Sequence, residues 1–465
     1  MMKKIPVIGV LLCLLILSGC AHYLVNDPKP EYQADYGYRY LPWKQTVKED
    51  EVYVALALSG GGTRAAALSY GVLQKLKATP IRDDSTTLLD EVDVISSVSG
   101  GSFTSAYYGL FGEQLFSDFK TDFLYRDIEG ELTRKLYAPT NWFRLMSPDF
   151  NRIDLAIELY DETVFQRKTY QDLIDAGRKP FIAINATNLT TGAQFTFTQP
   201  AFDLLGSDLS SLPVARAVAS SSAFPILLSP VSYQNHPASA GFELSRDMRH
   251  GLANGYDGPN ARRYLWAYNQ SIYHTDKAAH PYVHLMDGGL SDNIGVRYIV
   301  DNFSRTSGFL SLRKPKIKEL VVIIANAKTL PPESLDENES PPNLLDVLYK
   351  TTTISMDNYS FESIQVLKDM LHISESAAKL ILRCQAIIDQ YCSSGHQLTI
   401  SGHQYKVTVI ELNFLNIDDP EKRQRLLSMP TSFKLSRPQV DELINVGGEL
   451  LDESAAFQEL LKRIR

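Results

Sequence analysis

The sequence has little cysteine and no hydrophobic run long enough to span a membrane. Its longest apolar run covers residues 5–17, whereas a spanning helix needs about 20 apolar residues. Four of the 465 residues are cysteine, and no cluster of histidine and cysteine has the spacing of metal ligands. On one continuous helix Cys384 and Cys392 would lie ~12 Å apart, beyond the ~7 Å limit for a disulfide. We therefore expect no metal site, and free thiols at both positions.

The sequence also lacks an excess of basic residues. Lysine and arginine number 46 against 54 aspartates and glutamates, which gives a formal net charge of −8. Loss of residues 1–19 would remove Lys3 and Lys4 but no acid, and so lower the charge to −10. An acidic chain is a poor ligand for nucleic acid and gains nothing from an anionic lipid surface. We expect no nucleic-acid partner, and attachment to a membrane would need an anchor.

The N-terminus has the pattern of a removable targeting segment. Lys3 and Lys4 precede the apolar run, which ends in L-S-G-C at residues 17–20. This pattern resembles a bacterial lipoprotein processing site, which implies cleavage before Cys20 and lipid on its thiol and amine. The other interpretation is plain secretion, with Cys20 incidental. Several acyl chains suffice for stable anchoring, and because Ala21 rather than aspartate follows, the resemblance favours the bacterial outer membrane, facing the periplasm.

One stretch, residues 91–103, has the pattern of a strand followed by a sharp turn and a helix. A β-branched run, typical of a buried parallel strand, breaks at S-V-S-G-G (97–101) and continues as a segment small and apolar enough for a helix. Such a turn exposes the hydroxyl of Ser99 at a helix N-terminus, where a nucleophile is expected. Ser97 replaces the first glycine of the usual G-x-S-x-G pattern, so the motif by itself also fits an ordinary Ser/Gly-rich turn.

Two further stretches place glycines or a carboxylate at the ends of apolar strands. Residues 52–58 (VYVALAL) run into S-G-G-G-T-R-A at 59–65, whose unshielded amides and following helix suit a phosphate or an oxyanion. A P-loop is excluded because no Gly-Lys-Ser/Thr follows, and Ala65 makes a dinucleotide fingerprint poor. Downstream, another apolar strand ends in D-G-G at 287–289. It places the carboxylate of Asp287 at a strand end, where the sites of open α/β sheets lie.

In this order, the glycine loop, the elbow serine and the Asp-Gly-Gly turn resemble the patatin-like phospholipases. N-A-T at 185–187 and A-S-S-S-A-F-P at 219–225 also fit that family, and the resemblance covers residues 52–328. It implies a three-layer α/β/α sandwich with a mostly parallel central sheet, no cofactor, and lipid acyl hydrolysis of the phospholipase A or lysophospholipase type. Ala65 and Ser97 stand where the family's usual motifs have glycine. Neither position supplies a reacting atom, so these differences affect only the geometry of the two turns.

The resemblance also implies a set of site residues and their roles. These are the nucleophile Ser99, the proton acceptor Asp287, and an oxyanion hole at Gly60, Gly61 and Gly62 with Arg64 beside it. Ser99 would form an acyl-serine intermediate, which water then hydrolyses. Aspartate is a weak base, since its reference pKa of about 3.9 lies ~2.6 units below that of histidine, but burial raises such a pKa. The expected substrates are phospholipids or lysophospholipids of the membrane that holds the lipid anchor.

Three other functions fit parts of the pattern. A conventional Ser-His-Asp esterase would use one of the nine histidines, but His284, the nearest to Asp287, points to the opposite face of that strand. An acyltransferase would pass the acyl group to an alcohol instead of water. A lipoprotein that kept the fold as an inactive lipid-binding or scaffold module is disfavoured, because Ser99, Asp287 and the glycine set are all present.

The rest of the chain divides around a break rich in proline and acid at residues 330–342. We expect a signal peptide at 1–19, a tether at 20–50, the patatin-like phospholipase domain at 51–330 and a mainly helical extension at 331–465. Within the domain, residues 112–179 would form a helical cap over the acyl site or plain packing, and 233–281 a mobile lid or a solvated insertion. Two apolar stripes of the extension are expected to face the core: Ile364, Leu367 and Leu371, then Leu380, Cys384, Ile387, Ile388 and Tyr391.

Overall fold

The structure is a computed structural model that describes residues 26–40, 52–81, 86–225, 227–258, 260–304, 317–330, 339, 343–391 and 406–464. The predicted signal peptide, the lipidation site Cys20 and Cys392 lie outside these residues, so the expectations for them stay predictions. Across the described residues, no helix is both long and apolar enough to cross a bilayer.

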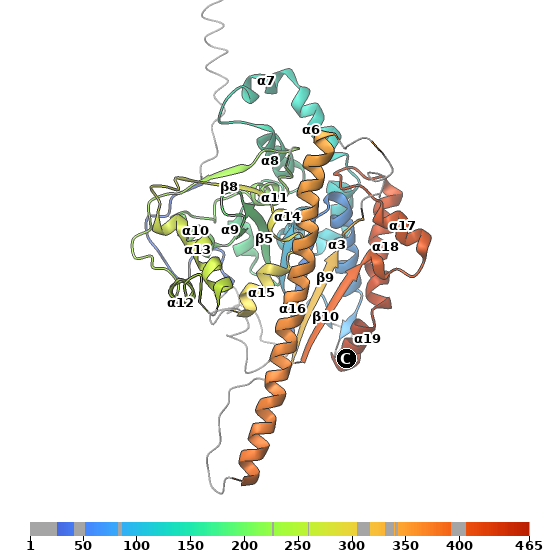
Figure 1. Ribbon diagram of the computed structural model, residues 1–465. Helices are drawn as coiled ribbons and strands as arrows, with labels where there is room; N and C mark the ends of the chain where they lie inside the picture. Colours follow the sequence, from blue (N-terminus) through green and yellow to red (C-terminus); the bar gives the residue numbers. More distant parts are fainter. Residues whose placement is uncertain are drawn as a thin grey trace, which may run out of the picture.

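One mixed sheet forms the centre of the molecule (Figure 1). In order across the sheet, the strands are β10 (Lys406–Asn413), β9 (Glu319–Asn326), β1 (Val52–Leu58), β4 (Val92–Val98), β5 (Phe181–Asn188), β8 (Tyr282–Asp287) and β7 (Val231–Gln234), with β6 (Gln194–Thr196) beside β5. The five strands from β10 to β5 pair in parallel, whereas the pairs β5–β6, β5–β8 and β8–β7 are antiparallel. A separate ribbon pairs β2 (Pro80–Ile81) with β3 (Thr86–Thr87).

The central strands are buried along their whole length. Every residue of β1, β4 and β5 is buried. This explains why β1 is an apolar run without alternation, since helices cover both faces of such a sheet. At the sheet edge, β10 instead alternates between buried and more exposed residues. The predicted fold class is therefore confirmed: a mostly parallel sheet with helices on both sides and a mainly helical C-terminal region.

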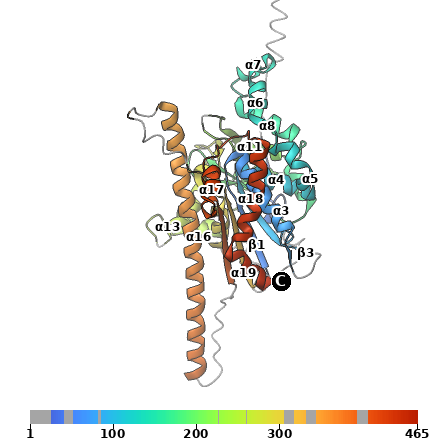
Figure 2. The ribbon, with the colours of Figure 1, turned by 90° about the vertical axis from the view of Figure 1, so that its right-hand side faces the viewer.

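Helices lie on both sides of the sheet, as Figure 2 shows. On one side, α3 (Gly62–Lys77) packs against α4 (Gly100–Phe111) and α18 (Arg437–Glu453). On the other side, α15 (Val296–Ser304) contacts β1 and β4, and it packs against α16 (Leu344–Tyr391). The C-terminal extension thus supplies a strand to the sheet and a helix to each layer.

Shorter helices fill the connections. The predicted helical segment 112–179 contains Gly112–Gln114 (3-10), α5 (Leu115–Phe119), Lys120–Leu124 (π), α6 (Ile128–Tyr137), α7 (Pro139–Leu145), α8 (Arg152–Thr163) and α9 (Tyr170–Ala176). Segment 233–281 contains α12 (Arg246–Ala253) and α13 (Ala261–Thr275), despite its lack of apolar periodicity. The others are α10 (Gln199–Leu204), α11 (Val214–Ser221), α14 (Gly289–Asp292), Phe414–Asn416 (3-10), α17 (Pro420–Leu427) and α19 (Ala455–Ile464).

The long helix α16 overturns one expectation about the core. Its first predicted stripe is buried where described, with Ile364 at 7% exposure and Leu367 at 0%. The second stripe is not core-facing, because Leu380 is 62% and Ile387 58% exposed, and Cys384 is exposed as a free thiol. Figures 1 and 2 show the reason: the second half of α16 runs beyond the body of the molecule, where no described element packs against it.

Candidate active site

The predicted nucleophile lies on a sharp turn between β4 and α4. Ser99 has φ +49° and ψ −117°, a conformation that costs a non-glycine residue roughly 1–3 kcal/mol and persists only where the surroundings impose it. The glycines that follow allow the turn to pack closely, since a Cβ on Gly100 would lie 2.1 Å from the carbonyl oxygen of Gly62. The strand–turn–helix predicted around Ser99 is confirmed.

The hydroxyl of Ser99 donates to a carboxylate from a distant strand. Its Oγ lies 2.9 Å from Oδ2 of Asp287, the last residue of β8. The other carboxylate oxygen, Oδ1, accepts the backbone N–H of Gly289 at 2.8 Å, which fixes the orientation of the group. Ser99 is 7% and Asp287 2% exposed, so the pair is shielded from bulk water. The structure brings together the two side chains that the sequence pattern pairs as nucleophile and base.

Burial makes Asp287 a stronger base than an ordinary aspartate. Loss of hydration raises its pKa to about 6, although the N–H of Gly289 and the hydroxyl of Ser99 favour the charged form and oppose that rise. At neutral pH the carboxylate is therefore still mostly ionised, yet it holds a proton more tightly than an aspartate in water does. A pKa closer to the working pH is what a general base needs.

The A-S-S-S-A-F-P segment (219–225) holds the nucleophile and the base in position. The Oγ of Ser221 accepts the N–H of Ser99 at 2.9 Å and donates to the carbonyl oxygen of Asn185 at 2.6 Å. The backbone of the same segment accepts the N–H of Asp287 at 3.1 Å. Sequence reasoning noted this run of serines only as fitting the family. Its positioning role depends on contacts between three segments that a motif does not reveal.

The glycine loop after β1 offers fewer free donors than predicted. The N–H of Gly60 donates to the carbonyl oxygen of Asn293 at 2.8 Å, so its predicted place in the oxyanion hole is corrected. Gly61 and Gly62 have φ +138° and +61°, conformations that favour glycine. In the described part of the chain their N–H groups have no hydrogen-bond acceptor. They stand at the N-terminus of α3, which favours negative charge, and are the available oxyanion donors.

Arg64 lies beside the glycine loop, as expected, but its guanidinium is engaged by the C-terminal part of the chain. Nε donates to the carbonyl oxygen of Ala327 at 2.9 Å, Nη1 to that of Met429 at 2.7 Å, and Nη2 to Oγ1 of Thr431 at 3.0 Å. Its side chain is 3% exposed, and these bonds offset the cost of burying the charge. Arg64 therefore fastens the end of β9 and the segment before α18 to the site.

A small pocket of about 90 Å³ opens at Ser99. Sequence reasoning missed six of its lining residues: Asn293, Lys328, Thr329, Thr353, Met356 and Thr431. Thr353 and Met356 belong to α16, so the extension beyond residue 330 helps to close the site although it carries no motif. Within the described chain, segments 112–179 and 233–281 contribute no lining residue. This absence favours plain packing over an acyl cap for segment 112–179. It favours a solvated insertion over a lid for segment 233–281.

Comparison with known proteins identifies the family. A sequence model of the patatin-like phospholipases matches residues 56–300, more than half of the chain. The chain belongs to the patatin-like phospholipase family. A search of curated protein sequences found no match.

Solved structures similar to this patatin-like chain include one human protein and one from Legionella pneumophila. Human GIVD cytosolic phospholipase A2 has 13% sequence identity and a TM-score of 0.40, with 95% of this chain and 69% of that chain covered. VipD from Legionella pneumophila has 10% identity and a TM-score of 0.32, with 97% and 73% covered.

In this patatin-like phospholipase, Asn293 contacts both glycine turns of the site. Its Oδ1 lies 2.3 Å from the position that a Cβ would take on Gly60 and 2.8 Å from that on Gly289, so only glycine leaves room for it. The same oxygen is buried and has no hydrogen-bond partner in the described part of the chain. In the sequence, its position six residues after Asp287 could have indicated that Asn293 lies at the site. Asn293 adds a polar amide to the pocket wall.

No described histidine lies at the patatin-like site. The pocket lining contains none of the six histidines in the described ranges: His236, His250, His274, His280, His284 and His372. The ring of His284 faces away from the pocket, with Nδ1 2.7 Å from Oγ of Ser232. His22, His396 and His403 lie outside the described residues. Of the described residues, then, Asp287 is the base that reaches Ser99.

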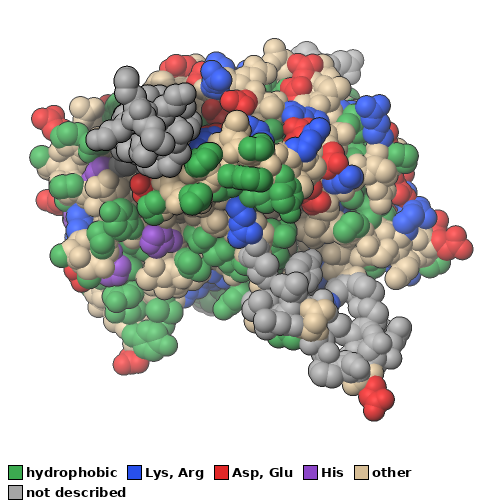
Figure 3. Space-filling model, turned by 90° about the horizontal axis from the view of Figure 1, so that it is seen from above, with side chains coloured by type: hydrophobic (Ala, Val, Ile, Leu, Met, Phe, Trp, Pro, Cys, Tyr) green, Lys and Arg blue, Asp and Glu red, His purple; other side chains and the backbone are tan. Residues whose placement is uncertain are grey.

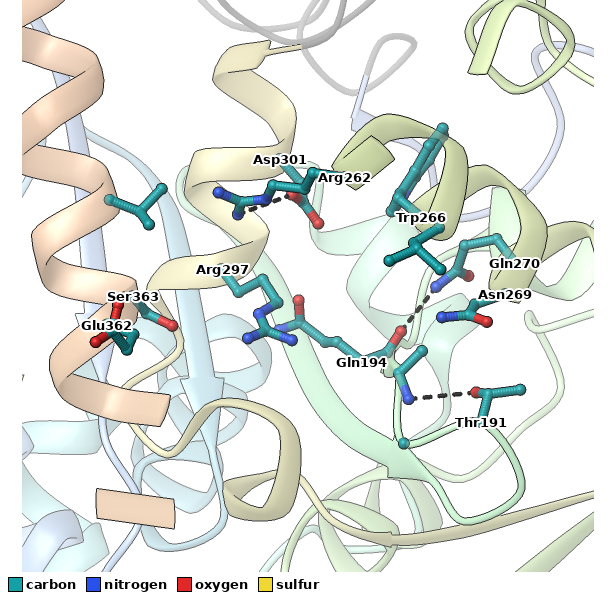
Figure 4. A pocket seen from close by; sticks show the side chains of 14 residues that line it. Thr191, Gln194, Arg262, Trp266, Asn269, Gln270, Arg297, Asp301, Glu362 and Ser363 are labelled. Carbon is teal, nitrogen blue, oxygen red and sulfur yellow. Dashed lines mark hydrogen bonds and ion pairs between the residues drawn. The ribbon is translucent and has the colours of Figure 1, made fainter. Parts of the chain in front are cut away.

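A larger cavity of about 420 Å³ lies between α13, α15 and α16 (Figure 4). An ion pair joins Arg262 to Asp301 at 3.5 Å across one side, and Nε2 of Gln270 donates to the carbonyl oxygen of Gln194 at 2.8 Å on another. Arg297 points into the cavity from α15. Among the described residues of its lining, no hydroxyl is hydrogen-bonded to a carboxylate or a histidine. In the described ranges, no three histidine, cysteine or acidic residues are grouped to hold a metal ion.

Proposed function

We propose that the protein is a lipid acyl hydrolase of the phospholipase A or lysophospholipase type, with Ser99 as nucleophile and Asp287 as proton acceptor. The 2.9 Å hydrogen bond from Ser99 Oγ to Asp287 Oδ2 carries the proposal. Membership of the patatin-like phospholipases supports hydrolysis of lipid esters. The free amides of Gly61 and Gly62 support an acyl-transfer reaction, because such donors stabilise a tetrahedral oxyanion.

The reaction proceeds in two acyl transfers. Oγ of Ser99 attacks the ester carbonyl carbon while Asp287 takes its proton, and the amides of Gly61 and Gly62 stabilise the oxyanion. Collapse of this intermediate breaks the ester bond, and Asp287 returns the proton to the departing alcohol. The acyl-Ser99 is then attacked by water, whose proton goes to Asp287. The second collapse releases the fatty acid and returns the proton to Ser99.

The pKa of Asp287 bears directly on the rate of both steps. A rise of the pKa from the ordinary aspartate value of 3.8 to about 6 recovers roughly 3 kcal/mol of the driving force that an aspartate lacks relative to a histidine. Ester leaving groups are easier to expel than amides, so a base of this strength suits lipid esters. The small volume at Ser99, about 90 Å³, has room for the ester and only the neighbouring part of a chain.

For the parts of the chain outside the site we propose the organisation that the sequence predicts. Residues 1–19 are a signal peptide, and the lipid on Cys20 holds the protein at the outer membrane on its periplasmic side. Within the predicted tether at 20–50, residues 26–40 instead pack against the body, where Lys29 and Arg39 pair with Asp203 and Tyr38 is buried. Residues 51–330 are the patatin-like domain, and the extension 331–465 completes its pocket. Incorporation of labelled palmitate into the parent chain, and its loss in Cys20→Ala, tests the anchor. Label retained in that variant would refute it.

A fluorophosphonate probe tests the nucleophile. The parent protein should be labelled at Ser99, and Ser99→Ala should lose both the label and hydrolysis of a p-nitrophenyl ester. Ser97→Ala is the matched control, because Ser97 is completely buried and its Oγ is 2.7 Å from that of Ser105. Label that persists in folded Ser99→Ala would refute the assignment. If the parent protein were not labelled, the inactive lipid-binding module would replace the hydrolase as the explanation of the fold.

A further inference from the structure

The α6–α7 arm carries a compact group of exposed apolar side chains. Tyr137, Trp142, Phe143 and Met146 lie within ten residues and are 70, 54, 63 and 82% exposed. No residue of α7 is buried. Figure 1 places α7 at one end of the molecule, beyond the sheet, and Figure 3, which looks onto that end, shows exposed hydrophobic side chains there. Such a group in water indicates an interaction surface.

The arm presents this group from a fixed position. Arg144 makes a two-pronged ion pair with Glu158 of α8, and its guanidinium lies 3.9 Å from the ring centroid of Phe150. Nζ of Lys135 is 3.9 Å from the carboxylate of Glu162, also on α8. These contacts anchor the polar side of the arm to the body, which leaves the apolar side facing outward.

The arm is also one loop away from the catalytic pocket. Oε1 of Glu129, on α6, accepts the hydroxyl of Ser432 and the N–H of Phe433, both at 2.8 Å. Thr431, directly before these residues, lines the pocket at Ser99. A surface that the arm touches is therefore close to the place where an ester must enter.

We propose that the tip formed by Tyr137, Trp142, Phe143 and Met146 inserts into the interfacial layer of a phospholipid bilayer and holds the Ser99 pocket beside its substrate. Tryptophan and tyrosine suit this layer, because each joins a large apolar ring to a polar group. Attraction between charges contributes little, since Lys135 and Arg144 are already paired with acids and the whole chain is acidic. Burial of the apolar tip drives insertion.

The size of the tip argues against a second copy of the chain as its partner. Four side chains at these exposures offer roughly 500 Å² per copy, against about 800 Å² per partner in a stable protein interface. A bilayer needs no matching surface, so a small convex tip is sufficient for it.

Quenching of tryptophan fluorescence by brominated phosphatidylcholine tests insertion without any turnover. The chain has three tryptophans, Trp43, Trp142 and Trp266. With the full chain on phosphatidylcholine vesicles, the parent should be quenched, Trp142→Phe should lose most of the quenching, and Trp266→Phe should keep it. Equal quenching of the parent and Trp142→Phe would overturn the proposal. Shielding of Trp142 that rises with protein concentration in the absence of vesicles would instead show self-association and also overturn it.

Quenching measured at different salt concentrations and lipid charges distinguishes apolar insertion from electrostatic attraction. Quenching on vesicles of phosphatidylcholine alone should be unchanged between low and high salt, because screening does not affect apolar burial. Quenching that requires anionic lipid, or that salt abolishes, would overturn the assigned driving force.

A last comparison rests on the proposed function, because it measures hydrolysis. Phe143→Ser should lower turnover of vesicle phospholipid roughly tenfold or more, as expected for the loss of one inserted aromatic side chain, and leave turnover of a soluble p-nitrophenyl ester unchanged. Tyr256→Ser is the matched control, since Tyr256 is also 63% exposed but lies elsewhere. An equal loss on both substrates would overturn the docking role. Quenching with no hydrolysis of either substrate would uphold docking and refute the hydrolase.

Discussion

Two cavities adjoin α16, and the smaller one contains the predicted nucleophile and base. The pocket at Ser99 measures about 90 Å³ and the cavity beside Arg297 about 420 Å³. In the first, a hydroxyl and a carboxylate at the ends of different strands are 2.9 Å apart, while in the second Arg262 pairs with Asp301 and Arg297 stacks over the ring of Tyr359. The close contact between a hydroxyl and a carboxylate, rather than the room available to a ligand, distinguishes the candidate site.

The difference follows from how each cavity is built. The small pocket lies where β1, β4 and β8 end, and glycines at those ends let backbone segments approach within contact distance. Ends of strands in an α/β sheet are the usual place of such sites. The larger cavity lies between α13, α15 and α16 and is also lined by the turn at residues 191–194. Three substitutions and a pH profile test this contrast between the two cavities.

Of these changes, Asp287→Asn should lower activity the most. Turnover of a p-nitrophenyl ester should fall by about 10⁴-fold, the scale seen when an asparagine replaces the aspartate of a catalytic triad, because an amide cannot accept the proton of Ser99. The rate of fluorophosphonate labelling measures the same step directly. His284→Ala, three residues earlier on the same strand, should remain active. If that histidine proved equally essential in a folded variant, a Ser-His-Asp triad would replace the dyad.

Gly61→Val should have the next largest effect. Turnover should fall roughly 10²–10³-fold, the range for loss of an oxyanion donor, because a side chain is strained at φ +138° and would crowd Arg64, whose Nη2 lies 2.9 Å from the Cβ position. Gly192→Val is the control from the larger cavity. Its φ of +66° is also unfavourable to a side chain, but no atom lies within 4 Å of the added Cβ. Equal kinetic losses in both variants would make the glycine loop an ordinary turn.

The pH dependence of activity tests the smaller pocket specifically, because Asp287 lines that pocket and not the larger cavity. Asp287 must be ionised to accept a proton, and burial raises its pKa to about 6. Activity should therefore fall as pH falls through about 6, approaching tenfold per unit below it. The measurement is kcat/KM for a soluble ester, with thermal stability followed over the same range. A fall in activity only near pH 3.8, the ordinary pKa of aspartate, would show that Asp287 is hydrated or is not the base.

Arg297→Gln should have the smallest effect. Turnover of a soluble ester should change by no more than about twofold, as expected for a residue that shares no partner with the catalytic groups. Arg297 lines the larger cavity and stacks over Tyr359, with 5.8 Å from its guanidinium carbon to the ring centroid. A tenfold loss in the folded variant would show that the two cavities are coupled through α16, which contributes to both.

Much of the fold and the centre of the site could be predicted from the sequence. Apolar runs that end in glycine-rich turns identify buried parallel strands, because such strands need no polar face and such turns need residues without a Cβ. Ser99 and Asp287 follow from those turns together with the family resemblance. The predictions failed where a residue's role depended on a partner far along the chain. The N–H of Gly60 is hydrogen-bonded to the carbonyl oxygen of Asn293, and the side chain of Leu380 is exposed instead of buried in the core.

By itself, the sequence determined which groups stand at the strand ends, since a turn motif is a local matter of backbone sterics and hydrogen bonding. Only the tertiary structure decided what surrounds them. It brings Met356 of α16 and Thr431 to the pocket, ties Arg64 to the C-terminal extension, and makes Ser221 the partner of the Ser99 amide. It also removes Asp287 from water, which raises its pKa. These features arise from contacts between segments more than a hundred residues apart, and no local pattern encodes them.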